Sequence, residues 1–270
     1  MVPGYDDFET DASSGHMMTL DAQTSYAFSK FNDFRLNNKA MSHNFTYKVD
    51  VKAHHTLDET ELRIWFFGTG RDDCMGLGGN DCIRRDQIHW YKDESLAIPV
   101  DDKFRKNGIA FMHHALQEHM HLANSYPVRG QKRDYSTCQA LNTGLYAEMC
   151  QLDTVQWISA GGDHSTDFYG QYGKINLSYG RKTGYNSHGP KFQQKGARVF
   201  EISVDHYTGE MEIDTWIRNA DGSQDDQDEV REPSEFSWLD KGHCLGTEKS
   251  QSILTDILPF ETENSWLPFQ

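Results

Sequence analysis

Histidines follow two short apolar segments of the chain directly or within a few residues. His113 and His114 come immediately after Gly108–Met112 (GIAFM), and His164 comes shortly after Val155–Ser159 (VQWIS). Imidazole nitrogen suits zinc, iron and manganese, and carboxylate oxygen completes a site of borderline hardness. Because ligands bind at the ends of strands in α/β sheets, these two positions are the best candidates for metal ligands.

The remaining histidines have a simpler interpretation. The chain contains 13 histidines, and an isolated one is more often a surface or structural residue than a ligand. His114, His119 and His121 lie within about one turn of His113, and their clustering could form a local metal site, but solvated positions on a helix are the favoured interpretation. No chemistry is expected of His54, His55, His89, His206 and His243.

The spacing of apolar side chains predicts the elements that position these residues. Helical spacing predicts helices at Asp86–Ala97, Leu116–Ala123 and Thr143–Leu152, the first of them opened by a capping residue. Short apolar or alternating segments predict strands at Phe45–Val51, Leu62–Gly68, Gly108–Met112, Val155–Ser159, Lys174–Tyr179, Ala197–Val204 and Glu210–Ile217. Strands that alternate with helices and then give way to further strands predict a mixed α/β (α+β) sandwich.

The two ends of the chain differ in composition from its middle. Residues 1–43 are polar and weakly periodic, which predicts a poorly ordered N-terminal segment. Residues 219–232 are dominated by Asp, Glu and Gln, so residues 219–270 are expected to form an acidic linker and tail. The folded part is therefore expected to span residues 44–218.

Charge and cysteine usage limit the function further. The chain has 26 Lys and Arg against 41 Asp and Glu, a formal charge of −15, which disfavours nucleic acid as a partner. No run of apolar residues is long enough to cross a membrane, and no secretory leader is recognised at the start. The 5 cysteines form no Cys-x-x-Cys pair and are odd in number, which argues against a complete disulfide framework and slightly favours a cytoplasmic location.

Several segments resemble, in the same order, the C-terminal half of calcineurin-like metallophosphoesterases, and in particular the purple-acid-phosphatase-related branch of fungi and plants. They are Gly108–Met120, Leu141–Tyr146, Gly161–Gly170 and Leu177–Val199, with a weaker match at Leu62–Lys92. The most specific of these stretches is Tyr179–Tyr185 (YGRKTGY). The resemblance implies the C-terminal part of a four-layer α/β/β/α metallophosphoesterase sandwich.

The resemblance also implies a chemistry. Two divalent metal ions of the iron, manganese or zinc type hold a phosphate ester and supply the hydroxide that attacks it. Carried over by position, His113 and His164 resemble metal ligands of this site. His114, Arg181 and Tyr185 are candidate catalytic residues. Arg181 and Tyr185 would contact the phosphate ester substrate, with His188 as a weaker candidate, and His114 could replace a missing metal ligand.

The chain departs from the family pattern at several ligand positions. Gly162 stands where the family has the first His of Gly-His-x-His, and Asp163 fills the variable position as a structural residue. The Asp-x-His, Gly-Asp-x-x-Asp and Gly-Asn-His motifs of the first half are missing, although Gly79-Asn80-Asp81 superficially resembles the last.

Three hypotheses follow from this pattern. The first is a truncated metallophosphoesterase that is weakly active or inactive on its own. The second is a non-catalytic pseudo-phosphatase that binds a protein partner through the retained scaffold. The third is a protein that binds a single metal ion through His113, His114, His164 and Asp167.

Overall fold

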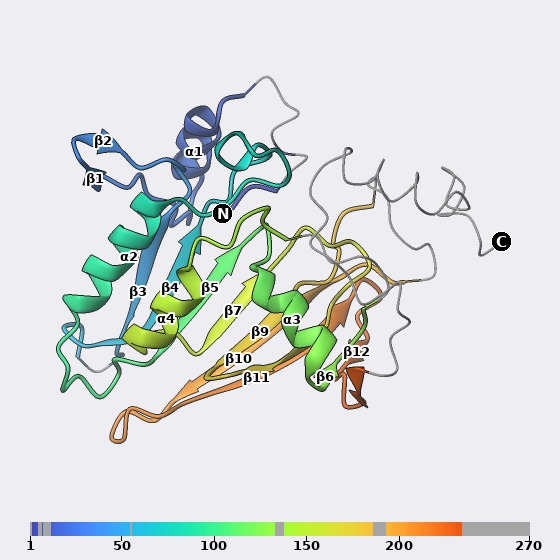
Figure 1. Ribbon diagram of the computed structural model, residues 1–270. Coiled ribbons are helices and arrows are strands. Elements are labelled where there is room, and N and C mark those ends of the chain that lie inside the picture. The colour runs from blue at the N-terminus through green and yellow to red at the C-terminus, as the bar shows by residue number, and fades with distance from the viewer. Residues whose placement is uncertain are drawn as a thin grey trace.

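A mixed sheet of eight strands forms the centre of the molecule (Figure 1). The computed structural model describes residues 2–4, 7, 12–54, 56–132, 138–185 and 193–233. The order across the sheet is β13-β6-β8-β9-β7-β5-β4-β3. These strands are β3 (Tyr47–Lys52), β4 (Thr60–Phe67), β5 (Gly108–Met112), β6 (Val128–Arg129), β7 (Trp157–Ala160), β8 (Tyr169–Tyr172), β9 (Ile175–Tyr179) and β13 (Val230–Arg231).

The four central strands of this sheet are parallel, and their register places the candidate ligands at one edge. β4 pairs with β5, β5 with β7 and β7 with β9 in parallel, whereas β3 and β8 add to the two sides antiparallel. Met112 at the end of β5 lies opposite Ala160 at the end of β7. The residues that follow these two strands therefore leave the sheet side by side.

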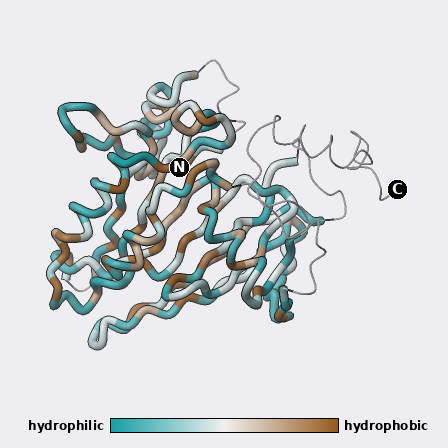
Figure 2. The backbone as a smooth tube through the Cα atoms, in the orientation of Figure 1, coloured by the Kyte–Doolittle hydropathy of each residue, from teal (hydrophilic) through white to brown (hydrophobic). Residues whose placement is uncertain are grey.

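Three helices cover one face of the sheet. They are α2 (Arg85–Leu96), α3 (Gln117–Ser125) and α4 (Leu145–Leu152), and all three lie in front of the sheet in Figure 1. Trp65 of β4 meets Trp90 and Tyr91 of α2 edge-on, with ring centroids 5.6 and 4.9 Å apart. Strands and helices bury their apolar residues toward one another, and the hydrophobic stretches in Figure 2 run mainly along the central strands. Burial of these aromatic side chains is the main source of stability on this face.

A smaller sheet covers the opposite face. It contains β10 (Gly196–Val204), β11 (Met211–Asn219) and β12 (Gln224–Asp225) in that order. Phe200 of β10 packs edge-on against Phe111 of β5 and Trp157 of β7, with centroids 5.8 and 5.5 Å apart. The result is a helix layer on two sheets, which agrees with the predicted α/β class and with part of a phosphoesterase sandwich.

The predicted helices and strands of the middle of the chain are confirmed to within a few residues, but the two ends were predicted wrongly in part. Residues 1–43 contain α1 (Ser14–Gln23) and the short strands β1 (Arg35–Leu36) and β2 (Lys39–Ala40). Ser13 caps α1 by accepting a hydrogen bond from the backbone N–H of His16, and Met18 is buried in a cluster with Phe45 and Tyr47. The expected linker contributes β12, as well as β13, which pairs with β6. Residues 234–270 lie outside the described part.

The cysteines also correct an expectation. Cys74 and Cys82 form a disulfide with Cα atoms 5.3 Å apart, beside the short 3-10 helix η2 (Cys74–Gly76). Cys138 is disulfide-bonded as well, and Cys150 is a free thiol. Disulfides are rare in cytosolic proteins, so this finding weighs against the expected cytoplasmic location. Among the described residues, no helix is long and apolar enough to span a membrane.

Candidate functional site

The ends of β5 and β7 bring the two predicted metal ligands together. His113 follows β5, and the backbone N–H of Gly161 after β7 donates to the carbonyls of both Met112 and His113, at 3.1 Å each. Burial first, and the neighbouring charge of His164 second, lower the pKa of His113 to about 4. Residues that are distant in the sequence therefore form one histidine pair at a strand end.

Glycine backbone surrounds the imidazole of His113. A Cβ atom at Gly162 would lie 3.3 Å from its Nε2, and one at Gly161 would lie 3.4 Å from its Nδ1. Gly4 approaches the same ring so closely that a Cβ there would lie 2.9 Å from Cε1. Gly162 also has a φ of +81°, a conformation that glycine adopts without a steric cost. A side chain at any of these three glycines would therefore press against the His113 ring.

The residues present do not fit a dinuclear metal centre. Among the residues described, the grouping of three His, Cys, Asp or Glu donor atoms close enough to hold an ion is Cys74, Asp81 and Cys82. Both of these cysteines are oxidised in the disulfide, so neither can offer a thiolate. Within the described part of the chain, no group of this kind contains His113 or His164. We derive no catalytic step through a metal from this arrangement.

His114 is enclosed by other protein groups, as expected of a structural residue. Its side chain is buried, its Nε2 lies 3.0 Å from the backbone carbonyl of Arg71, and its ring meets that of His113 edge-on at 4.9 Å. Burial first, and the charge of His113 second, lower its pKa to about 3. His119 is also buried, against Tyr179 at 5.3 Å, and burial lowers its pKa to about 4. The expectation that these two histidines occupy solvated helix positions was wrong, whereas His121 is exposed.

Arg181 and Asp167 form a buried ion pair. The guanidinium Nε lies 2.5 Å from Asp167 Oδ2, with side-chain exposures of 6% and 0%. Arg181 also donates to the backbone carbonyl of Gln194 and to Asn219 Oδ1, while Asp167 accepts from the backbone N–H of Gln131. These bonds connect the large sheet to the smaller one. They account for both side chains without a substrate or a metal ion.

Two sequence candidates remain, Tyr185 and His188. Tyr185 is exposed to 75%, and His188 falls outside the described residues. Sequence reasoning also missed Arg198 of β10, whose half-buried guanidinium donates to the Tyr179 carbonyl at 2.8 Å and lies 5.0 Å from the Tyr169 ring centroid. Burial lowers the pKa of Arg198 to about 10. An arginine at an inward position of an otherwise apolar strand was the signal that could have identified it.

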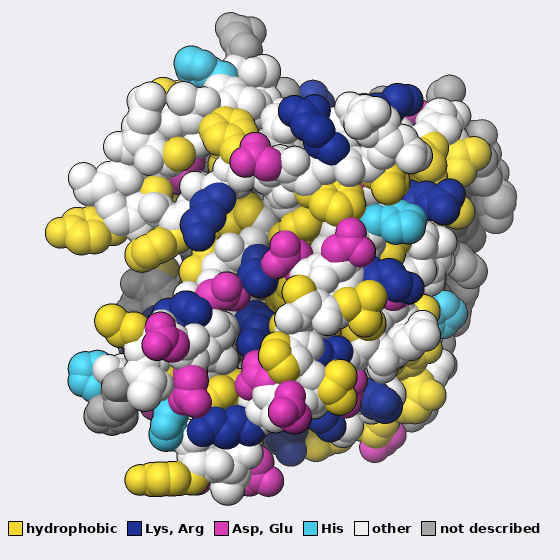
Figure 3. Space-filling model, turned by 90° about the vertical axis from the view of Figure 1, so that its left-hand side faces the viewer, with side chains coloured by type: hydrophobic (Ala, Val, Ile, Leu, Met, Phe, Trp, Pro, Cys, Tyr) yellow, Lys and Arg dark blue, Asp and Glu magenta, His cyan; other side chains and the backbone are white. Residues whose placement is uncertain are grey.

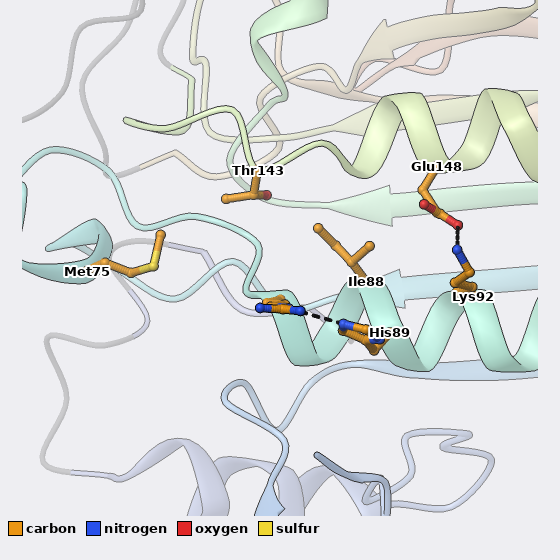
Figure 4. Close-up of a pocket in the computed structure, with 7 residues that line it drawn as sticks. Met75, Ile88, His89, Lys92, Thr143 and Glu148 are labelled. Carbon is orange, nitrogen blue, oxygen red and sulfur yellow. Dashed lines mark hydrogen bonds and ion pairs between the residues drawn. The ribbon is translucent and has the colours of Figure 1, made fainter. Parts of the chain in front are cut away.

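A groove between η2, α2 and the start of α4 is a second candidate site (Figure 4). Its volume is about 470 Å³. Ion pairs and hydrogen bonds link its polar side chains: Lys92 to Glu148 at 3.0 Å, and Arg85 to His89 at 3.2 Å. Met75, Ile88 and Thr143 complete the lining. On the face shown in Figure 3, Lys and Arg side chains are interspersed with Asp, Glu and apolar ones, so that face carries charges of both signs.

The fold and the histidines at the strand ends together indicate the class of protein. A parallel βαβ core, covered by helices on one face and by a second sheet on the other, is the architecture expected of a calcineurin-like phosphoesterase part. No family model matches the chain. Comparison with known proteins nevertheless identifies two relatives of this class, both from Arabidopsis thaliana.

The first relative is named "Probable inactive purple acid phosphatase 29". It is 23% identical over 192 residues, which cover 66% of this chain and 49% of the relative. The second is "Probable inactive purple acid phosphatase 14", 24% identical over 132 residues that cover 46% of this chain and 33% of the relative. The chain thus spans about half the length of the first and a third of the second. These matches confirm the resemblance to the purple-acid-phosphatase-related branch, and both relatives are named inactive.

Proposed function

We propose that this chain is a non-catalytic, phosphatase-related protein that acts as a protein-binding scaffold. The single observation that carries this proposal is the contact between His113 and Gly162. Glycine has no side-chain ligand atom, and a side chain at this position would press against His113. A hydrolase of this class needs two metal ions to bind phosphate and to lower the pKa of the attacking water.

Two further observations support the same proposal. Arg181, the cation expected to contact substrate, is neutralised by Asp167. The formal charge of −15 repels phosphate groups and favours a protein partner over nucleic acid. The competing hypothesis is a weakly active metal-dependent phosphoesterase.

Metal content and turnover discriminate between these hypotheses. The purified chain is loaded separately with iron, manganese and zinc, dialysed, and analysed for bound metal and for hydrolysis of p-nitrophenyl phosphate. We expect less than one equivalent of metal, no turnover above the buffer, and the same urea midpoint with and without EDTA. One or two equivalents of metal with turnover that disappears in His113→Ala would establish the phosphoesterase instead.

A further inference from the structure

The disulfide loop that leads into α2 contains the donor atoms of a metal site in a masked form. The sulfur atoms of Cys74 and Cys82 and a carboxylate oxygen of Asp81 lie within 4.8 Å of one another, and all three residues are buried. No other group of three such donors among the described residues is as compact. While the two sulfurs are bonded to each other they offer no thiolate. Reduction converts them into two thiols that can lose their protons to a metal ion.

The loop between the two cysteines has room to adjust to an ion. A tetrahedral zinc ion with Zn–S bonds of about 2.3 Å holds its sulfurs about 3.8 Å apart, so bonded sulfurs must separate by about 2 Å to bind it. A Cβ atom at Gly76 or Gly78 would have no atom within 4 Å, and Leu77 is 69% exposed. The tip of the loop is therefore loosely packed and can take up this displacement.

Neighbouring groups hold the carboxylate of Asp81 beside the two sulfurs. The backbone N–H of Cys82 donates to Asp81 Oδ1 at 2.7 Å, and the guanidinium of Arg84 donates to the same oxygen at 2.6 Å. Gly70 passes so close to the carboxylate that a Cβ atom there would overlap Oδ2. The carboxylate is thus fixed in direction by its surroundings, as metal ligands are in built sites.

The charges and donor types around this group suit zinc. A zinc ion bound by two thiolates and one carboxylate carries a single net negative charge, which Arg84 beside Asp81 balances. Thiolate ligands select zinc over harder cations such as magnesium and calcium. His43 Nε2 lies 3.5 Å from Asp81 Oδ2, and its side chain is only 15% exposed. Since zinc also accepts imidazole nitrogen, His43 is the candidate for a fourth ligand.

We propose that the reduced chain binds one Zn²⁺ ion through Cys74, Cys82 and Asp81. A dithiol reductant such as dithiothreitol gives two electrons and two protons to the disulfide and is itself oxidised to a cyclic disulfide. The two thiols then release their protons to solvent as their sulfurs bind the ion. The loop before α2 is closed by a covalent bond under oxidising conditions and by zinc under reducing ones.

This inference does not rest on the proposed protein-binding function. The metal analysis described for that function concerns the chain with its disulfide closed, in which Cys74 and Cys82 cannot bind an ion. The zinc site of the reduced chain involves neither His113 nor His164. The two proposals can therefore fail separately.

The first test compares the reduced and the oxidised chain. The full chain is reduced with dithiothreitol, freed of it by anaerobic gel filtration, and titrated with Zn²⁺ in competition with a chromophoric chelator. The oxidised chain is treated in the same way without the reductant. We expect one equivalent of zinc on the reduced chain and none on the oxidised one, and a higher urea midpoint with zinc for the reduced chain only. Equal binding in the two states, or no binding in either, would overturn the proposal.

Cobalt(II) in place of zinc reports which atoms bind the ion. In the reduced chain it should give a sulfur-to-cobalt charge-transfer band with the intensity of two thiolates, together with the visible bands of a tetrahedral site. The double variant Cys74→Ser, Cys82→Ser should lose this band and the zinc equivalent, whereas Cys150→Ser removes the free thiol and should keep both. A double variant that still binds one equivalent would show that other thiols hold the ion.

Two amide substitutions test the carboxylate. Asp81→Asn keeps the size of the side chain and is expected to weaken zinc binding by the reduced chain at least tenfold. Asp72→Asn is the matched control in the same loop, where the Asp72 side chain is 52% exposed, and it should change the affinity less than twofold. Urea unfolding of both oxidised variants verifies that they fold. Equal zinc affinities of the two variants would overturn the assignment of Asp81 as a ligand.

Discussion

The imidazole of His113 lies so close to Gly162 that a Cβ atom at residue 162 would be 3.3 Å from its Nε2. The family position that supplies a metal ligand is therefore occupied here by a residue that must be small for the loop to fit. The positive φ of Gly162 and its close approach to His113 both favour glycine at this position. Restoring the ligand alone would push the loop away from the ring.

Substitution of Gly162 should show this packing in the free energy of unfolding. Gly162→Ala introduces strain at a φ of +81° together with close contact to His113, and we expect a loss of about 2–4 kcal/mol. Gly222→Ala is the matched control, because its φ is +86° and no atom lies within 4 Å of a Cβ there. Urea unfolding measures both. Equal losses in the two variants would show that contact with His113 contributes nothing.

The buried ion pair of Arg181 and Asp167 should be sensitive to removal of one partner. Arg181→Met leaves the carboxylate of Asp167 buried without its cation, and we expect a loss of about 3–5 kcal/mol in the free energy of unfolding. Lys106→Met removes one partner of an exposed pair with Asp153 and should change it by about 0.5 kcal/mol or less. A loss below 1 kcal/mol for Arg181→Met, measured by urea unfolding, would contradict a structural role.

The buried histidines predict a pH dependence of stability. Burial lowers the pKa values of His113, His114 and His119 to about 4, 3 and 4 in the folded chain, so below pH 6.5 the unfolded chain takes up protons first. Stability is therefore fully present above this pH and is lost as the pH falls toward the folded values. Each histidine contributes a slope of about 1.4 kcal/mol per pH unit.

Urea midpoints measured between pH 7 and pH 4.5 test this prediction. His119→Met removes one of these groups and should make the slope shallower, whatever its effect on stability at pH 7. A midpoint that stays constant over this range, or a slope that does not change in the variant, would count against neutral buried histidines.

The disulfide between Cys74 and Cys82 should stabilise the chain by constraining a short loop. The double variant Cys74→Ser, Cys82→Ser is expected to lose about 2–3 kcal/mol, the value that loop-closure entropy gives for a loop of this length. Cys150→Ser alters a free thiol and serves as the control for cysteine removal. Thermal unfolding measures the stability of both variants. Equal melting temperatures of the double variant and of Cys150→Ser would exclude a stabilising disulfide.

Much of the fold could be predicted from local patterns. The strand at Gly108–Met112 was predicted to the residue, and the helix predicted at Asp86–Ala97 matches α2 to within one residue at each end. In both segments the spacing of apolar residues and the burial agree. β8 and β13 were missed because Tyr169–Tyr172 is interrupted by Gly170 and Val230–Arg231 is only two residues long, so neither has a readable alternation.

The candidate site was predictable only in part. That His113 and His164 lie at neighbouring strand ends follows from the sequence pattern, because consecutive parallel strands end at one edge. The pairing of Arg181 with Asp167 depends on how the loops after β7 and β9 approach each other, and the contact of Gly4 with His113 joins residues far apart in the chain. No local pattern encodes such contacts.

The bond between Cys74 and Cys82 has a consequence for biosynthesis. A chain made where thioredoxin and glutathione keep thiols reduced would leave the ribosome with the loop before α2 open, although its remaining core could still assemble. Passage through an oxidising compartment, or refolding with a thiol–disulfide pair, would close it. Preparations from a reducing host and from an oxidising one would then differ at the entrance of the groove that Met75 lines, before any partner is added.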